Sequence, residues 1–262
     1  MPRFKAVVLD WAGTMIDYGS FAPMGAFVKA FAEFGVAITI DEARRPMGLP
    51  KRAHIAALLG DARIAEAWER VHGARPGEAE IDRLYAVFVP MNEAVAADHA
   101  TLVPGAAQAV AALRARGLRI GSTTGYTRSI MERILPLAAA QGYAPDNLVC
   151  ADDLAEGRPG PLMMYKCFVD LAVYPPAAVV KVDDTEPGIA EGVAAGCYTV
   201  GVALSGNIVA RTPEEIAGLS EDERGALRAM ASERLRAAGA DAVIDTVADL
   251  PDLLARLETP AG

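Results

Sequence analysis

The chain has 262 residues and a formal net charge of −9 at pH 7. This length allows one large domain, or a domain with an insertion, and the charge argues against nucleic acid or an anionic membrane as partner. No apolar run approaches the length of a membrane span, and the N-terminus lacks the apolar region of a signal peptide. Three widely spaced cysteines without a CxxC pair fit a reducing compartment. We therefore expect a cytoplasmic protein.

Short apolar segments that end in polar residues alternate with helical patterns through most of the chain. We expect strands over 5–10, 118–123, 147–150, 177–182, 198–202 and 242–245, and helices over 105–116, 128–141, 162–171, 187–195 and 221–238. This alternation predicts an α/β fold, a Rossmann-like core whose parallel sheet is covered by helices on both faces. Ligands of such sheets bind beyond the carboxyl ends of the strands.

The interval between the first two expected strands has a different pattern. It contains no convincing strand, and helical stretches are expected over 23–33, 51–59, 62–71 and 78–97. We therefore predict an α-helical cap domain, residues 18–103, inserted into an α/β catalytic core formed by residues 1–17 and 104–262. The hinges are expected near residues 17–20 and 100–104.

Two of the expected strands end in carboxylates. Asp10 is followed by a loop of small residues, where backbone N–H groups can hold a phosphoryl group while the carboxylate attacks phosphorus or binds a metal. From this motif alone, a loop or helix-capping aspartate is an equally good interpretation. Asp183 and Asp184 are either a site for a hard cation or a capping pair for the next helix. The metal interpretation is strengthened by considering the two motifs together, because Asp10 and the Asp183–Asp184 pair would lie at the ends of strands that converge on one crevice.

Two loops carry groups that suit a phosphate. The segment 121–127, which includes Thr124, Gly125 and Tyr126, offers hydroxyls and helix-start amides, although a simple strand-to-helix turn fits it equally well. Arg158 lies in a loop of glycine and proline, and a guanidinium matches phosphate oxygens in bidentate fashion. An isolated loop arginine is usually only solvated.

Lys51 and His54 share one face of a helix that begins at the lysine. The helix dipole and partial burial would both favour the neutral amine, which is the nucleophilic form needed for imine formation. The alternative is an ordinary surface lysine and a surface histidine, which is the more common finding at a helix start.

Taken together, these residues resemble the haloacid dehalogenase superfamily, whose motifs Asp10, Thr124, Arg158 and Asp184 follow in order. Within that superfamily the chain is similar to the phosphonatase family. The similarity rests on the segments 10–19, 45–51, 121–127, 157–159 and 181–185. The segment that contains Lys51 is the specific part, because the other motifs identify only the superfamily.

The resemblance implies hydrolysis of the carbon–phosphorus bond of phosphonoacetaldehyde to acetaldehyde and phosphate, through a lysine imine and an aspartyl-phosphate. It implies a homodimer that buries cap surface, Mg²⁺ as cofactor and a small phosphonate as the bound partner. The implied catalytic residues are Asp10, Lys51, His54, Thr124, Tyr126 and Met47. The implied substrate-binding residues are Arg158, Gly125, Gly48 and Thr124. The implied magnesium ligands are Asp10, Ala12 through its carbonyl, and Asp184.

Ala12 connects this resemblance to the chemistry. Most phosphatases of the superfamily carry a second aspartate at that position to protonate the leaving oxygen, and losing such an acid costs about two to four orders of magnitude in rate. A carbon leaving group instead needs an electron sink, which a protonated imine on Lys51 would provide.

The fourth motif departs from the usual Gly-Asp pair with a later aspartate, since this chain has Asp183 before Asp184 and the segment Glu186-Pro-Gly188 after it. The third metal carboxylate and the role of Asp183 therefore stay open, as does the role of Ser20. The alternatives are a dehalogenase-like hydrolase that needs neither magnesium nor Lys51, a sugar-phosphate phosphatase or mutase, and a non-catalytic phosphate-binding protein.

Overall fold

A computed structural model describes residues 3–258 and confirms the α/β fold. Five parallel strands form one sheet in the order β2-β1-β3-β4-β5. They are β1 (Ala6–Leu9), β2 (Arg119–Ser122), β3 (Val179–Asp183), β4 (Tyr198–Val202) and β5 (Ala242–Ile244). Because β1 lies between β2 and β3, the carboxyl ends of these three strands meet at one edge of the sheet.

The strand expected over 147–150 was a wrong prediction. This segment runs beside β2 but is reduced to a single parallel bridge between Thr123 and Val149. The backbone N–H groups on this edge of β2 donate to side chains instead. Asp146 accepts from the N–H of Ile120 at 2.8 Å, and Asn147 accepts from the N–H of Ser122 at 3.3 Å. A regular ladder needs backbone carbonyls at those positions.

Helices cover both faces of the sheet, as the alternating side chains of the strands require. Val7 and Leu9 of β1 pack in one hydrophobic cluster with side chains of α6 (Ala106–Ala115), α7 (Arg128–Ala140) and α12 (Leu250–Glu258). Ala6 and Val8 point to the opposite face, which is covered by α8 (Leu162–Asp170), α9 (Glu186–Ala194) and α11 (Glu221–Ala237). The side chains of Lys181 and Asp183 point toward this second face.

The other helical elements of the core are short. They are α10 (Pro213–Ala217) and the 3-10 helices η2 (Pro176–Ala178) and η3 (Val247–Asp249). The five helices expected in the core are all present, within one residue at each end. The sequence patterns did not predict α10 and α12.

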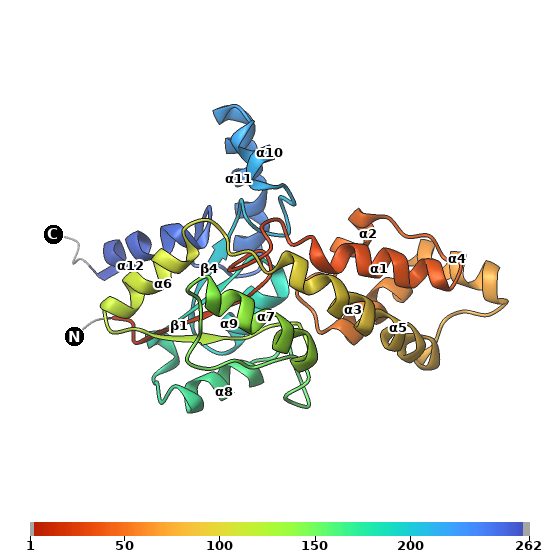
Figure 1. Cartoon of the computed structure of the whole chain (residues 1–262), viewed down its shortest axis with the longest axis horizontal. Helices are drawn as coiled ribbons and strands as arrows, with labels where there is room; N and C mark the ends of the chain where they lie inside the picture. Colours follow the sequence, from red (N-terminus) through yellow and green to blue (C-terminus); the bar gives the residue numbers. More distant parts are fainter. Residues whose placement is uncertain (1–2, 259–262) are drawn as a thin grey trace.

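Five helices between β1 and β2 form a separate bundle, which lies at one end of the molecule in Figure 1. They are α1 (Ala22–Glu33), α2 (Ile40–Arg44), α3 (Lys51–Gly60), α4 (Ala62–His72) and α5 (Glu78–Ala96). They enclose their own hydrophobic cluster, centred on Phe27, Trp68 and Phe88. We call this bundle the cap. Only α2, which begins with a capping box between Thr39 and Glu42, was not expected.

Two linkers join the cap to the core and run antiparallel to each other. Ile16 and Leu102 form a bridge, and the backbone N–H of Asp17 donates to the carbonyl of Thr101 at 3.1 Å. His99, in the 3-10 helix η1 (Ala97–His99), pairs with Asp17 at 3.2 Å. The positions of the hinges and the domain boundaries remain predictions. Between residues 3 and 258, no helix is both long and apolar enough to cross a membrane.

Candidate active site

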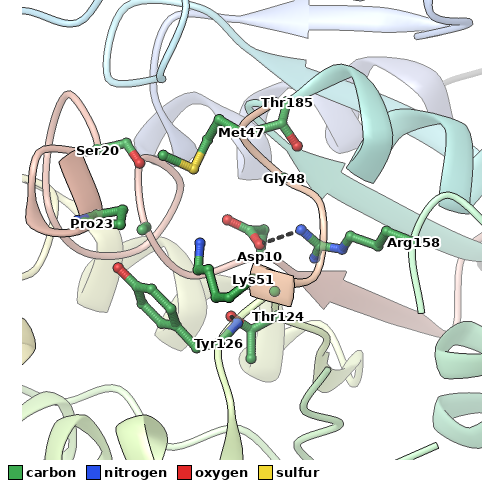
Figure 2. Close-up of a pocket in the computed structure, with 12 residues that line it drawn as sticks. Asp10, Ser20, Pro23, Met47, Gly48, Lys51, Thr124, Tyr126, Arg158 and Thr185 are labelled. Atoms are coloured by element: carbon green, nitrogen blue, oxygen red, sulfur yellow. Dashed lines mark hydrogen bonds and ion pairs between the residues drawn. The ribbon is translucent and has the colours of Figure 1, made fainter. Parts of the chain in front are cut away.

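A small pocket lies where the cap meets the carboxyl ends of the strands (Figure 2). The core contributes side chains from the ends of β1 and β2, and the cap contributes the segment that leads into α3. The lining residues are Asp10, Ala12, Ser20, Pro23, Met47, Gly48, Lys51, Thr124, Gly125, Tyr126, Arg158 and Thr185. Nine of the eleven residues expected at the site line this pocket. Asp184 and His54 are the exceptions.

Asp10 is fixed by the sheet and by one guanidinium. Its backbone N–H donates to the carbonyl of Val182 at 3.0 Å, which continues the pairing of β1 with β3. Its Oδ1 lies 2.9 Å from Nη1 of Arg158. Burial, followed by repulsion from Asp183, raises the pKa of Asp10 to about 7 despite this ion pair. The carboxylate therefore needs more positive charge nearby to stay ionised at neutral pH.

Arg158 is buried and contacts three carboxylates rather than standing free in the pocket. Besides Asp10, it lies 3.2 Å from Asp183 and 3.1 Å from Glu191. It was expected to hold phosphonate oxygens, and this role remains a prediction. The structure adds that the guanidinium is already oriented by ion pairs on the core side, so that only its pocket-facing edge is left for a ligand.

Lys181 is a second buried cation that the sequence interpretation left without a role. Its Nζ lies 3.0 Å from both Asp183 and Glu191 and donates to the hydroxyl of Thr123 at 2.7 Å. Burial and the neighbouring Arg158 lower its pKa, but the two carboxylates outweigh them and raise it. A lysine in the middle of an apolar strand was the signal that could have revealed this network.

Asp184 lies behind the pocket, next to the loop that follows Asp10. Its carboxylate accepts from the hydroxyl of Thr14 at 3.2 Å and from the backbone N–H of Asn207 at 2.7 Å. Burial, followed by repulsion from Asp10 and Asp183, raises the pKa of Asp184 well above its usual range.

Asp10, Asp183 and Asp184 offer oxygen atoms that all lie within 4.8 Å of one another, and all three carboxylates are buried. Four carboxylates are buried here, those of Asp10, Asp183, Asp184 and Glu191. Only two strongly basic cations, Arg158 and Lys181, are buried beside them. A set of buried oxygen donors with surplus negative charge fits a divalent hard cation such as magnesium. Repulsion between these carboxylates adds to the effect of burial in raising the pKa values of Asp10 and Asp184.

Lys51 is the first residue of α3 and is buried, so the surface alternative does not hold for it. Its Nζ lies 5.0 Å from the ring centre of Tyr126 and 5.9 Å from that of Phe27. Burial lowers the pKa of Lys51 to about 8, although attraction to Asp10 opposes this. In Figure 2 the amine extends from the cap into the same space as the Asp10 carboxylate of the core.

His54 is fully buried beneath Lys51 and does not line the pocket. Its ring stacks on Phe27 with centres 4.0 Å apart, and its Nε2 lies 2.8 Å from the carbonyl of Ala43. Burial and repulsion from Lys51 lower the pKa of His54 to about 3, so the ring is neutral. With Nε2–H donating to the carbonyl, Nδ1 is a buried acceptor without a partner.

The turn after β2 and the cap segment before α3 approach each other closely. Thr124 accepts from the backbone N–H of Tyr126 at 3.1 Å, and a Cβ on Gly125 would lie 3.1 Å from the carbonyl of Leu49. Gly48 has a φ of +93°, and a Cβ there would lie 2.3 Å from the Thr185 hydroxyl. Gly48 lines the pocket, and its expected place beside the substrate stays a prediction. The structure adds that glycine here also lets the cap backbone come close to the core residue Thr185.

Two residues at this contact were not assigned from the sequence. Ser20 is buried, lines the pocket, and has a hydroxyl without a hydrogen-bond partner. Arg44 of α2 is buried and reaches across to Asn207 in the core, with Nη1 and Oδ1 3.0 Å apart. No local pattern marks Arg44, because its role depends on how the cap sits on the core.

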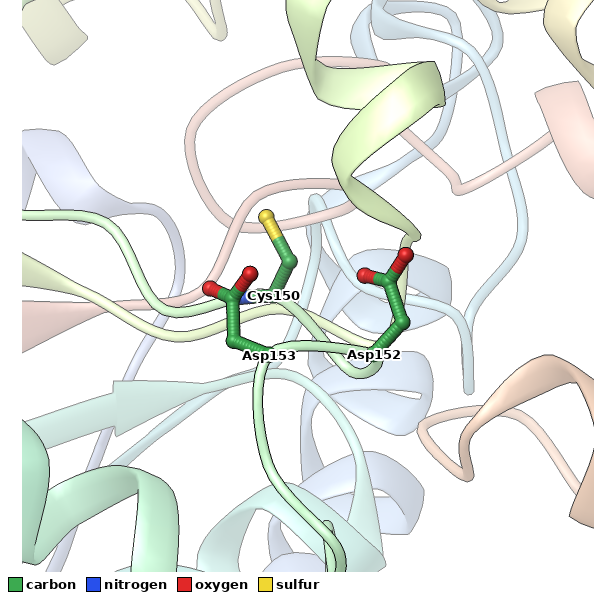
Figure 3. A group of neighbouring side chains, drawn as sticks. All are labelled: Cys150, Asp152 and Asp153. Atoms are coloured by element: carbon green, nitrogen blue, oxygen red, sulfur yellow. The ribbon is translucent and has the colours of Figure 1, made fainter.

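A second group of possible metal ligands, Cys150, Asp152 and Asp153, lies away from the pocket (Figure 3). Asp152 accepts from the backbone N–H of Arg128 at the start of α7, and Asp153 forms an ion pair with the Arg128 side chain. Burial raises the pKa of the Cys150 thiol to about 12, so it stays protonated. These groups already have structural roles in capping α7.

The fold and site define a class. The chain resembles the haloacid dehalogenase superfamily in four features. These are an aspartate at the end of β1, a buried cation beside it, two adjacent aspartates at the end of β3, and a helical insertion between β1 and β2. Residues 4–196 match the family model of haloacid dehalogenase-like hydrolases. The chain therefore belongs to this class of hydrolases.

Full-length relatives narrow the class. The chain is 53% identical over 258 residues to the phosphonoacetaldehyde hydrolase of Paraburkholderia phytofirmans and 52% identical to that of Paraburkholderia xenovorans, covering 98% of this chain and 97% of each relative. The crystal structure of a phosphonoacetaldehyde hydrolase-like protein from Oleispira antarctica matches with a TM-score of 0.96 and 43% identity, covering 98% of this chain and 93% of that one. Within its class, the chain belongs to the phosphonoacetaldehyde hydrolase family.

Proposed function

We propose that this protein hydrolyses the carbon–phosphorus bond of phosphonoacetaldehyde, with Lys51 as the imine-forming amine and Asp10 as the nucleophile. One observation carries the proposal: the buried amine of the cap and the strand-end carboxylate of the core line the same small pocket. The names of the full-length relatives support the substrate.

Lys51 is suited to attack an aldehyde. With a pKa of about 8, roughly one tenth of the amine is neutral at pH 7, compared with less than about one thousandth for a lysine of ordinary pKa. Condensation of the amine with the aldehyde releases water and gives an imine. The unpartnered Nδ1 of the neutral His54, one helical turn away, is the candidate hydrogen-bond acceptor that orients the Lys51 amine, because a pKa of about 3 prevents the ring from taking the proton itself.

Protonation of the imine creates the electron sink. A carboxylate oxygen of Asp10 forms a bond to phosphorus while the carbon–phosphorus bond breaks, and the electron pair moves into the iminium to give an enamine. Enamine protonation and imine hydrolysis release acetaldehyde and return Lys51. Water then releases phosphate from Asp10. No acid is needed for a leaving oxygen, which fits Ala12 at the pocket wall.

Magnesium bound to Asp10, Asp184 and the carbonyl of Ala12 would neutralise the surplus carboxylate charge and the charge that develops on the phosphoryl group. The protein itself supplies Arg158, whose Nη1 lies 2.9 Å from Oδ1 of Asp10. We expect the Thr124 hydroxyl and the backbone N–H of Gly125, both at the pocket, to hold phosphonate oxygens, because the backbone N–H of Thr124 already donates to the carbonyl of Val149 at 3.1 Å.

A coupled assay tests this proposal. Acetaldehyde release from phosphonoacetaldehyde is followed through its reduction by an alcohol dehydrogenase, with and without added magnesium. We expect turnover that depends on magnesium and produces acetaldehyde and phosphate in equal amounts. Hydrolysis of simple phosphate esters without any acetaldehyde release from the phosphonate would reject the proposal.

A further inference from the structure

A second cavity, of about 180 Å³, lies at the junction of the cap and the core. It shares no lining residue with the pocket that contains Asp10 and Lys51. Helix α2 of the cap forms one side, and the loop after β4 and helix α11 of the core form the other. The lining residues are Asp41, Arg44, Arg45, Asn207, Ile208 and Arg234. With three arginines and one carboxylate in its lining, the cavity favours an anion, and its volume exceeds several-fold what a single water needs.

Arg44 is a buried cation without a counter-ion in contact with it. The residue is 8% exposed, and its Nη1 donates only to neutral acceptors, namely the carbonyls of Gly19 and Ser20 and the side-chain oxygen of Asn207. Its Nη2 is buried without a hydrogen-bond partner. No ion pair between residues 3 and 258 includes Arg44. Because buried charges are normally paired, this guanidinium lacks a partner that the protein itself does not supply.

The nearest acidic groups act on Arg44 only from a distance. Burial lowers the pKa of Arg44, although attraction to Asp17, Asp184 and Asp41 opposes this. Asp17 instead accepts from the backbone N–H of Ala22, and Asp184 accepts from the backbone N–H of Asn207. The counter-charge for the guanidinium therefore has to come from outside the chain.

Arg234 of α11 approaches the same cavity from the core. Its Nε and Nη2 both donate to one oxygen of Glu186, with Nε at 2.8 Å, whereas Nη1 has no hydrogen-bond partner among the residues that the structure describes. The side chain is half exposed, so a ligand can reach it from solvent. Arg45 is two-thirds exposed and pairs with Asp61, and we therefore assign it no part in binding.

We propose that this cavity binds a tetrahedral oxyanion such as phosphate between Arg44 of the cap and Arg234 of the core, and that the bound anion favours the closed arrangement of cap and core. The donors of a guanidinium match the oxygens of such an anion. A ligand that contacts both parts binds best when they are together, and so it shifts the population toward closure. The inference does not rest on the proposed function, because the cavity lies outside the candidate active site.

Phosphate binding to variants of the core arginine tests the site. Equilibrium dialysis with radiolabelled phosphate, at an ionic strength held constant with chloride, counts the phosphate bound per chain. Arg234→Gln should weaken binding at one site by roughly tenfold to a hundredfold, the effect of losing a hydrogen-bonding charge. Arg236→Gln is the matched control, because Arg236 lies on the same helix, is exposed and does not line the cavity.

Two further variants separate the arginine from its surroundings. Arg234→Lys keeps the charge without the fork of donors and should retain part of the affinity. Glu186→Gln removes the carboxylate that competes for Arg234 and should strengthen binding. Acetate, which has a single charge and is planar, should displace phosphate poorly at equal concentration.

Amide hydrogen exchange of the linker at residues 17–20 tests the effect on closure, because Arg44 holds the carbonyls of Gly19 and Ser20. Phosphate should slow this exchange more in wild type and in Arg236→Gln than in Arg234→Gln. Equal slowing in all three proteins would overturn the bridging of cap and core.

The site itself would be overturned if Arg234→Gln bound as much phosphate as wild type, if Arg236→Gln lost as much as Arg234→Gln, or if Glu186→Gln bound more weakly. Acetate that competes as well as phosphate would overturn the assignment to a tetrahedral oxyanion. These measurements need no turnover, so failure of the proposed function would leave their outcome unchanged.

Discussion

Arg44 of the cap and Asn207 of the core are joined by a buried hydrogen bond of 3.0 Å. The backbone N–H of Asn207 donates to Asp184 at 2.7 Å, and the Arg44 guanidinium also donates to the carbonyls of Gly19 and Ser20 in the first linker. A single side chain of the cap is thus connected to the linker and, through Asn207, to a carboxylate of the candidate metal centre. Holding the cap closed excludes water from the pocket.

Replacing Arg44 should therefore weaken catalysis without touching the reacting groups. Buried hydrogen bonds to a charged group are worth about 1.5–3 kcal/mol, so Arg44→Gln should lower kcat/KM by roughly tenfold to a hundredfold. The matched control is Arg45→Gln, since the Arg45 side chain is two-thirds exposed and pairs with Asp61 on the cap surface. Steady-state kinetics check this, and equal effects of the two changes would contradict the role of Arg44.

Lys51→Arg keeps a positive charge at the pocket but removes the amine that forms an imine. We expect acetaldehyde release to fall to the background rate, while Lys29→Arg, elsewhere in the cap, keeps wild-type activity. Retained turnover in Lys51→Arg would mean that the side chain acts only through its charge.

Lys51→Met should be inactive and yet more stable than wild type at pH 7. Burial lowers the pKa of Lys51 to about 8 from 10.5, so charging the buried amine costs about 3 kcal/mol below pH 8. The unfolded chain binds the extra proton between pH 8 and 10.5, so this penalty fades as the pH rises through that window. Thermal unfolding at pH 7 and pH 10 measures the change. If Lys51→Met were as much more stable than wild type at pH 10 as at pH 7, the lowered pKa of Lys51 would be contradicted.

Magnesium affinity should fall as the pH drops through 7. Burial and neighbouring carboxylates raise the pKa of Asp10 to about 7 and the pKa of Asp184 well above its usual range, so protons compete with the metal as the pH falls. Without magnesium, stability should decrease as the pH rises from about 4 to 7, because a folded-state pKa above the unfolded one favours the protonated form.

Differential scanning fluorimetry at pH 6 and pH 8, with magnesium or a chelator, checks the metal dependence. The stabilisation by magnesium should be larger at pH 8 than at pH 6, and chelation should abolish turnover at both values. An equal shift at the two pH values would argue that Asp10 and Asp184 are not the ligands.

The sheet and the strand-end groups could be predicted because local patterns determine them. The apolar run before Asp10 and the one before Asp183 are long enough to indicate buried strands, and parallel strands place their carboxyl ends together. The segment 147–150 was wrongly predicted as a strand because its residue pattern resembles one. In the structure, the side chains of Asp146 and Asn147 accept the hydrogen bonds from the edge of β2.

The parts of the site that the sequence did not predict depend on contacts between segments that are distant in the chain. Whether Lys51 is exposed or buried depends on the cap meeting Tyr126 of the core, and no property of the helix start reveals this. The resemblance implied a catalytic place for His54, which shares a helical face with Lys51, but its ring stacks on Phe27 and does not line the pocket. Glu191 of α9 pairs with Lys181 of β3, and no local pattern marks Glu191 for this role.

Borohydride trapping of the imine tests the central claim most directly. The protein is treated with borohydride in the presence and absence of phosphonoacetaldehyde, digested, and examined by mass spectrometry of its peptides. We predict inactivation only when both reagents are present, with one reduced adduct on the peptide that contains Lys51. Labelling at another lysine, or full activity after treatment, would contradict the account.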